Sequence, residues 1–69
     1  MKKGKSIRVA DFRKARCYTQ AHLAKLLGVT QSTVAMWETG KVIPSMKNII
    51  SLAKVLGVTV DDICACIEQ

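Results

Sequence analysis

The sequence predicts an all-α fold of five short helices in one compact domain. Apolar residues recur at three- and four-residue spacing along most of the chain, which is typical of amphipathic helices. Ser or Thr precedes each apolar segment, Gly follows three of them, and no segment alternates convincingly enough to form a strand. With 69 residues, 49% of them hydrophobic, the chain is near the lower limit at which a core supports a fold without metal or disulfide bonds.

The N-terminal part is expected to comprise a basic arm and the first helix. Residues 1–5 are predicted to form a flexible basic arm, and residues 6–69 the folded domain. Ser6 is a suitable N-cap for a helix that extends to about Arg16. The apolar residues at helical spacing in this segment are Ile7, Ala10, Phe12 and Ala15.

The second and third helices are separated by a short link. Thr19 and Thr30 are expected to cap helices over residues 20–27 and 31–39. The side chains expected to be buried are Leu23, Ala24, Leu26, Leu27, Val34 and Trp37. A link this short forces the two helices to cross at a large angle, and the small Ala24 lies where their backbones must approach. The first turn of the third helix is therefore expected to project outward.

Glycine in the positive-φ conformation is expected to end three of the helices, at Gly28, Gly40 and Gly57. Ser45 is the expected cap of a fourth helix over residues 46–56. The inward side chains of that helix, at i, i+3, i+4 and i+7 spacing, are Ile49, Leu52, Ala53 and Leu56. Thr59 and Asp62 have the spacing of a capping box and open a short fifth helix at residue 60.

The charge of the chain is strongly asymmetric. The formal net charge is +6, and nine of the eleven Lys and Arg residues lie in residues 1–41 together with only two acids, Asp11 and Glu38. The rest of the chain is close to neutral. A basic half beside a near-neutral half suggests a surface that faces a polyanion.

The cysteines and the other reactive residues indicate neither a metal site nor an enzyme. The number of cysteines is odd and no signal-peptide stretch is present, which argues against a set of disulfide bonds. We interpret Cys17, Cys64 and Cys66 as small, partly buried apolar residues in a reducing compartment. One His, no clustered carboxylates and no glycine-rich phosphate loop leave no set of catalytic residues, so no cofactor is expected. No apolar run approaches the roughly 20 residues of a membrane span, and a cytoplasmic location is expected.

The middle of the chain contains an ordered set of residues with fixed spacing. They are Thr19-Gln20, Leu23-Ala24, Leu26, Gly28-Val29, Glu38-x-Gly40-Lys41, Pro44-Ser45, Leu52-Ala53 and Leu56-Gly57. With them, the chain from Ile7 to Ile63 resembles the Cro/C1-type (XRE-like) helix-turn-helix family of phage and bacterial transcriptional regulators. The resemblance implies a compact five-helix, lambda-repressor-like DNA-binding domain whose second and third helices form the helix-turn-helix. It also implies a sequence-specific regulator of transcription, most simply a repressor that binds a pseudo-palindromic operator as a homodimer.

The resemblance assigns DNA base-reading positions to the third helix. Gln31 and Ser32 match such positions, and Thr33 opens the same helix. A Gln amide carries a donor and an acceptor that match N6 and N7 of adenine in the major groove. Met36 occupies a position where family members often have a polar base-reader, so an apolar contact with a thymine methyl group is expected there.

Other positions are expected to contact phosphates or to hold the domain together. Gln20 matches a residue that typically bonds a DNA phosphate, and the further phosphate candidates are Thr39, Lys41 and Lys47. Arg13 and Glu38 match positions that often pair to tie the first helix to the end of the third. The remaining structural positions are Ala24, Gly28, Val34 and Trp37, the last standing where the family usually has an aliphatic core residue.

Two alternatives remain open at this stage. The same fold serves as a protein-interaction module, antitoxin-like or partner-binding, or as the DNA-binding fragment of a longer regulator. If the fifth helix pairs two copies, its apolar candidates are Val60, Ile63 and Ile67.

Overall fold

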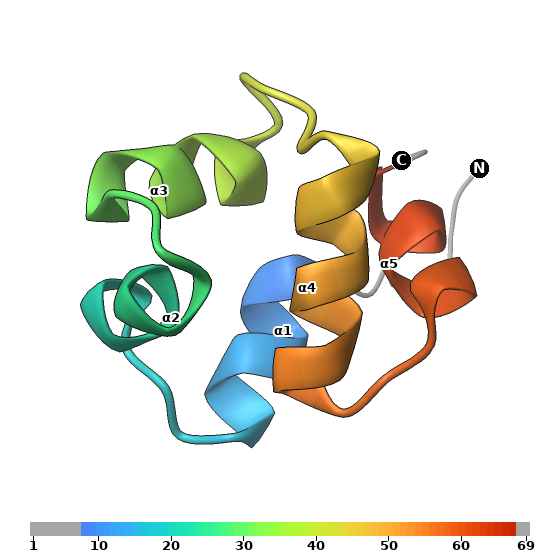
Figure 1. Cartoon of the computed structure of the whole chain (residues 1–69), viewed down its shortest axis with the longest axis horizontal. Helices are drawn as coiled ribbons and strands as arrows, with labels where there is room; N and C mark the ends of the chain where they lie inside the picture. Colours follow the sequence, from blue (N-terminus) through green and yellow to red (C-terminus); the bar gives the residue numbers. More distant parts are fainter. Residues whose placement is uncertain (1–7, 68–69) are drawn as a thin grey trace, which may run out of the picture.

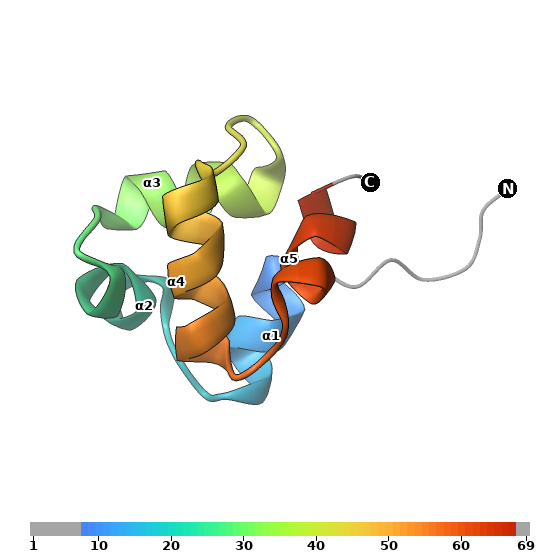
Figure 2. The same ribbon diagram turned by 45° about the vertical axis from the view of Figure 1, so that its right-hand side comes forward.

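Helix α4 runs through the middle of the molecule, with the pair α2 and α3 on one side and α5 on the other (Figures 1 and 2). The computed structural model describes the backbone of residues 8–67 and the side chains of residues 8–66. The five helices are α1 Val9–Ala15, α2 Gln20–Leu27, α3 Gln31–Thr39, α4 Met46–Leu56 and α5 Val60–Ile67. Residues 8–67 contain no strand, and the predicted all-α fold is confirmed.

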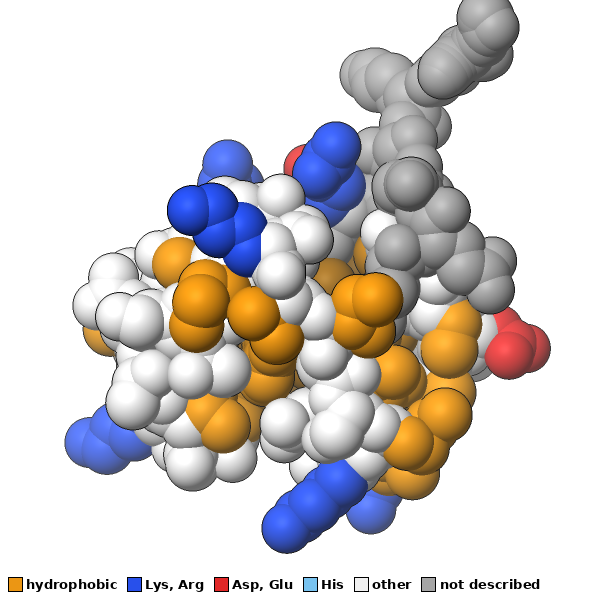
Figure 3. Space-filling model, turned by 90° about the horizontal axis from the view of Figure 1, so that it is seen from above, with side chains coloured by type: hydrophobic (Ala, Val, Ile, Leu, Met, Phe, Trp, Pro, Cys, Tyr) orange, Lys and Arg blue, Asp and Glu red, His pale blue; other side chains and the backbone are white. Residues whose placement is uncertain are grey.

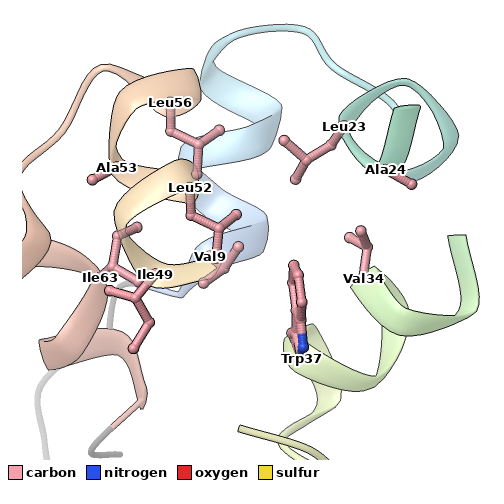
Figure 4. Close-up of a cluster of buried hydrophobic side chains, with 10 residues drawn as sticks. All are labelled: Val9, Leu23, Ala24, Val34, Trp37, Ile49, Leu52, Ala53, Leu56 and Ile63. Carbon is pink, nitrogen blue, oxygen red and sulfur yellow. The ribbon is translucent and has the colours of Figure 1, made fainter. Parts of the chain in front are cut away.

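The core lies where all five helices meet (Figure 4). It consists of Val9 from α1, Leu23 and Ala24 from α2, Val34 and Trp37 from α3, Ile63 from α5, and four residues of α4: Ile49, Leu52, Ala53 and Leu56. Leu23, Val34, Leu52 and Ile63 are completely buried. Burial of apolar side chains from every helix around one central helix is the main stabilising term for a chain this small.

The predicted caps of the helices are present. The hydroxyl oxygens of Thr19, Thr30 and Ser45 accept hydrogen bonds from backbone N–H groups three residues later, at 3.0, 3.1 and 3.3 Å. Thr59 and Asp62 form the reciprocal capping box, with both hydrogen bonds at 3.0 Å. These local bonds set where α2, α3, α4 and α5 begin, because each satisfies an N–H that the helix leaves without an intrahelical partner.

The start of α1 differs from the expectation. The helix begins at Val9, two residues later than a cap at Ser6 implies, because the Asp11 carboxylate accepts a hydrogen bond from the backbone N–H of Arg8 at 2.8 Å. Arg8 is therefore the N-cap. Ser6, the expected cap, and residues 1–5, the expected arm, lie outside the described residues, as does Ile7.

Two burial predictions are wrong, and one candidate for pairing is buried. Leu26 is 48% exposed, because α2 turns it away from α3 and α4 while Leu23 and Ala24 fill the contact. Cys17 is exposed, whereas Cys64 and Cys66 are partly buried as expected. Ile63, one of the candidates for pairing two copies, is fully buried in the core of its own chain and is not available for pairing, and the side chain of the candidate Ile67 lies outside the described residues.

Cys17 adopts the conformation that glycine adopts at helix ends. Its φ is +62°, and it is the only non-glycine residue with positive φ among the described residues. A β-carbon in this region costs roughly 1–2 kcal/mol. We therefore expect Cys17→Gly to raise the free energy of unfolding by about 1 kcal/mol, after allowance for the greater freedom of glycine in the unfolded chain.

Thermal unfolding followed by circular dichroism measures this effect. Cys17→Ser is the matched control, because it also removes the thiol but keeps the β-carbon. We expect a rise in Tm of several degrees for the glycine variant and almost none for the serine variant. Equal changes in the two would show that the thiol, and not the backbone conformation, sets the stability at this position.

Candidate nucleic-acid interface

Helices α2 and α3 are joined by a tight turn. Gly28 has φ +74°, a conformation that L side chains rarely adopt, and the N–H of Val29 returns to the carbonyl of Ala24 at 3.0 Å. The side chain of Ala24 is small enough to lie buried where α2 and α3 pack together. The chain then enters α3 after only Val29 and Thr30. The geometry is that of a helix-turn-helix, in which the first turn of the second helix is presented outward.

The base-reading candidates on α3 differ in their exposure to solvent. Gln31 and Ser32 are exposed in its first turn, whereas Thr33 and Met36 are partly buried. The hydroxyl of Thr33 lies 2.8 Å from that of Thr30, so it is already engaged in the cap of the helix. The structure thus presents Gln31 and Ser32 most openly, with Met36 one turn beyond Ser32 on the same helical face.

The phosphate candidates surround the far end of α3 and the start of α4. Lys41 and Lys47 are exposed, and Thr39 is exposed with its hydroxyl donating to the carbonyl of Met36 at 3.2 Å. No acidic residue stands in the first turn of α2, α3 or α4, whereas α1 carries Asp11 and α5 carries Asp61 and Asp62 there. The positive ends of α2, α3 and α4 are therefore left free to attract an anion.

Gln20 belongs to a polar cluster that connects three helices. Its Nε2 donates to Oε1 of Glu38 at 2.9 Å. Glu38 also accepts from Nε and Nη2 of Arg13, at 2.7 and 3.3 Å, and Nη1 of Arg13 donates to the carbonyl of Tyr18 at 2.8 Å. The expected pair of Arg13 and Glu38 is thus present. Since an amide nitrogen carries two hydrogens, Gln20 keeps one N–H for a further acceptor.

A family comparison matches this arrangement. The model of a helix-turn-helix family matches residues 9–63, which include all of α1 to α4 and the start of α5. The chain belongs to this helix-turn-helix family. The resemblance to Cro/C1-type regulators that the sequence indicates is confirmed.

Curated relatives of this chain are named as regulators of transcription. The chain is 33% identical over 57 residues to the cryptic phage CTXphi transcriptional repressor RstR of Vibrio cholerae, covering 83% of this chain and 51% of that protein. It is 47% identical over 45 residues to an uncharacterized HTH-type transcriptional regulator of Methanocaldococcus jannaschii, covering 65% of this chain and 68% of the relative. A similar regulator of Archaeoglobus fulgidus is 38% identical over 56 residues, with 81% and 79% covered.

The chain thus spans about half the length of the cholera phage repressor. No solved structure matches it in the comparison. Within the described part of the chain, no helix is long and apolar enough to cross a membrane.

A cleft of about 290 Å³ lies beside the C-terminal end of α3 in this helix-turn-helix domain. Trp37, Ile43 and Cys66 are among its lining residues. Partial burial raises the pKa of the Cys66 thiol above its usual value, and the nearby carboxylates of Asp11 and Asp62 raise it further. The Cys66 thiol therefore stays protonated at neutral pH. Separately, residues 8–66 contain no group of three His, Cys, Asp or Glu side chains that could hold a metal ion.

Sequence reasoning missed the apolar surface next to this interface. Val42, Ile43, Met46 and Ile50 are all exposed, by 42, 69, 58 and 43%. Two signals in the sequence indicate it. Val42 and Ile43 are adjacent apolar residues in a loop, and Met46 and Ile50 are four residues apart but outside the inward stripe of α4.

Proposed function

We propose that this protein is a sequence-specific, double-stranded DNA-binding regulator of transcription that reads the major groove with α3. The observation that carries the proposal is the first turn of α3, where Gln31 and Ser32 are exposed on a helix held against α2 by the turn at Gly28. Polar side chains in the N-terminal turn of such a helix are placed to reach base edges when the helix enters the groove.

The charges around α3 support the same role. Lys41 and Lys47 stand exposed beyond its C-terminal end, and Gln20 offers one N–H from the start of α2. Contacts on both sides of the recognition helix fix its register on the two phosphate backbones, while base contacts supply specificity. Residues 1–5 contain three further lysines. We propose that this segment is an arm that precedes the domain at residues 6–69 and contacts the DNA backbone.

The direction of regulation and the assembly are part of the proposal. A relative named as a phage transcriptional repressor supports repression, in which a bound domain blocks access to the promoter. Two copies on a pseudo-palindromic operator would place their α3 helices about 34–36 Å apart, one helical turn of DNA. Such a regulator works on DNA, and we place it in the cytoplasm.

Selection from a randomised duplex pool at about 150 mM salt, near physiological ionic strength, tests the proposal. Enrichment of a two-fold-symmetric motif with half-sites about one turn apart supports a dimeric reader of sequence. Retention of DNA without enrichment of any motif would contradict it. The basic surface would then bind DNA without reading it, and the protein-interaction role would become the better account.

Replacement of Gln31 by alanine is expected to weaken binding to the selected site by about 1–3 kcal/mol, because a bidentate contact to adenine is lost. Binding to unrelated duplex should hardly change. Fluorescence anisotropy with a selected and a scrambled duplex measures both affinities.

Lys41→Ala is the matched control for Gln31→Ala. It should weaken binding to both duplexes similarly and reduce the dependence of affinity on salt, without a change in the preferred sequence. Equal losses on both duplexes for Gln31→Ala would contradict a base-reading role for Gln31. An altered preferred site for Lys41→Ala would contradict a phosphate contact by Lys41.

A further inference from the structure

The cleft beside the C-terminal end of α3 is bounded by three helices and a loop. Arg8 and Val9 line it from the start of α1, Trp37 from α3, Ile43 from the α3–α4 loop and Cys66 from α5. Its volume of about 290 Å³ is at the lower end of the roughly 300–1,000 Å³ that small-molecule pockets occupy. The cleft therefore has room for a small organic molecule.

The indole N–H of Trp37 is a donor without an acceptor at the wall of this cleft. The side chain is only 7% exposed, and no described residue accepts a hydrogen bond from its Nε1. In residues 8–66 no side-chain N or O is both shut off from solvent and without a partner, so this N–H reaches solvent, and the cleft is the opening that its side chain lines. Figure 4 shows the indole nitrogen at the end of the ring away from Leu23. Because the N–H of a buried tryptophan usually has a partner, this donor indicates a ligand with an acceptor.

The charged groups of the cleft favour an anionic acceptor. The Glu38 carboxylate already accepts hydrogen bonds from Arg13 and Gln20 at 2.7 to 3.3 Å, and the Arg13 guanidinium balances its charge. A cationic ligand would thus find this carboxylate occupied. The guanidinium of Arg8 forms no ion pair with a residue in the described part of the chain. A carboxylate can therefore accept from the N–H of Trp37 and is attracted by the free charge of Arg8.

The α5 side of the cleft favours an apolar group. Partial burial raises the pKa of the Cys66 thiol, and the carboxylates of Asp11 and Asp62 raise it further, so a second negative charge is not favoured there. Ile43, on the loop, is 69% exposed. Figure 3 shows hydrophobic side chains gathered on the face that carries the α3–α4 loop, with Lys and Arg side chains around its edge. We thus expect the carboxylate of a ligand at Trp37 and its apolar part at Cys66 and Ile43.

We propose that this cleft is a binding site for a small carboxylate with an aromatic or branched aliphatic body. The carboxylate accepts a hydrogen bond from the indole N–H of Trp37, and the apolar body covers Ile43 and Cys66. The inference does not depend on the proposed function, because the base-reading candidates Gln31 and Ser32 stand in the first turn of α3 and the cleft lies at its other end.

Two-dimensional amide NMR of the full chain tests the inference, with phenylacetate, benzoate and isovalerate as probes. Trp37 is the single tryptophan, so its indole N–H gives one signal that reports the expected hydrogen bond directly. We expect saturable shifts of this signal and of the backbone amides of Val9, Gly40 and Cys66, with a Kd of about 1 mM or below for at least one probe.

Two matched compounds separate the charge from the apolar body. Phenylacetamide has nearly the same shape as phenylacetate but no charge, and it should bind several-fold more weakly. Acetate keeps the charge but has almost no apolar surface, and it should cause no saturable shift.

Two variants test the proposed donors. Trp37→Phe keeps an aromatic ring in the core but removes the N–H, and it should weaken binding of phenylacetate roughly tenfold. Arg8→Gln removes an exposed charge and should weaken binding roughly threefold, as followed by the amide shifts. Lys14→Gln is the matched control, since it also removes one positive charge from an exposed position on α1 but does not line the cleft. If Trp37→Phe fails to fold, Arg8→Gln and phenylacetamide carry the test.

Three results overturn the inference. The first is the absence of saturable shifts with all three carboxylates up to about 10 mM, where even a weak site would fill. The second is a set of shifts confined to the first turns of α2, α3 and α4, which would show general attraction of anions to helix N-termini. The third is an affinity of Arg8→Gln for phenylacetate equal to that of Lys14→Gln, which would place the ligand elsewhere.

Discussion

Truncation of Leu52 to alanine is expected to lower the free energy of unfolding by about 3 kcal/mol, within the roughly 2–5 kcal/mol found for buried Leu→Ala changes. Leu52 is completely buried on the central helix α4, where it faces side chains from α2 and α3 (Figure 4). A domain of 69 residues is expected to be stable by only about 3–10 kcal/mol. The variant therefore loses a large share of its stability and has a much lower urea midpoint.

Leu26→Ala is the matched control, because the same atoms are removed from a leucine that is 48% exposed. Its cost should stay below about 0.5 kcal/mol, as for most surface substitutions. The fluorescence of the single tryptophan, Trp37, reports unfolding because that side chain is buried in the same core. Similar urea midpoints for the two variants would contradict the assignment of Leu52 to the centre of the core.

Most of the fold could be predicted because its local signals are strong. Thr19, Thr30 and Ser45 each begin a helix where the sequence predicts it, and Gly28 ends one in the expected left-handed conformation. These features depend only on a few neighbouring residues, so a sequence reveals them without any knowledge of tertiary contacts.

The errors occur where local patterns compete or where packing decides. Asp11 competes with Ser6 as the signal for the start of α1, and a carboxylate hydrogen bond to Arg8 sets the boundary. Leu26 has helical spacing from Leu23 and yet faces solvent, since α3 and α4 cover only one face of α2. Ile63 has the pattern of both a core residue and a pairing residue, and only the packing of α5 against α4 distinguishes the two.

The candidate site, like the fold, could be predicted only in part. Gln31 and Ser32 are exposed on α3 where the family resemblance places base-readers, and their DNA contacts stay a prediction. The hydrogen bond between Gln20 and Glu38 was not predicted, because the family resemblance assigns Gln20 to a DNA phosphate and local sequence patterns do not reveal contacts between helices. That bond gives Gln20 a fixed orientation at the start of α2 and links the proposed phosphate contact to the ion pair of Glu38.

Removal of the Glu38 carboxylate is expected to destabilise the domain by about 3–5 kcal/mol, as for other broken buried ion pairs. The side chains of Arg13 and Glu38 are only 11 and 7% exposed, and their Nε–Oε2 distance is 2.7 Å. In Glu38→Ala the Arg13 guanidinium keeps the carbonyl of Tyr18 as an acceptor but loses its counter-ion in a place with little water. Gln20 also loses its acceptor, and the tie between α1, α2 and α3 is broken.

A double-mutant cycle with Arg13→Ala separates the ion pair from general loss of packing. Once Glu38 is alanine, Arg13→Ala should cost much less than it does alone, because no charge is then left unpaired, and the coupling should reach about 1–3 kcal/mol. Urea unfolding of the four proteins measures it, and additive costs would show that the two side chains contribute independently. Because Glu38 also orients Gln20, Glu38→Ala should weaken binding to specific and unrelated duplexes alike at temperatures where the variant is still folded, whereas loss of a base contact weakens only the specific one.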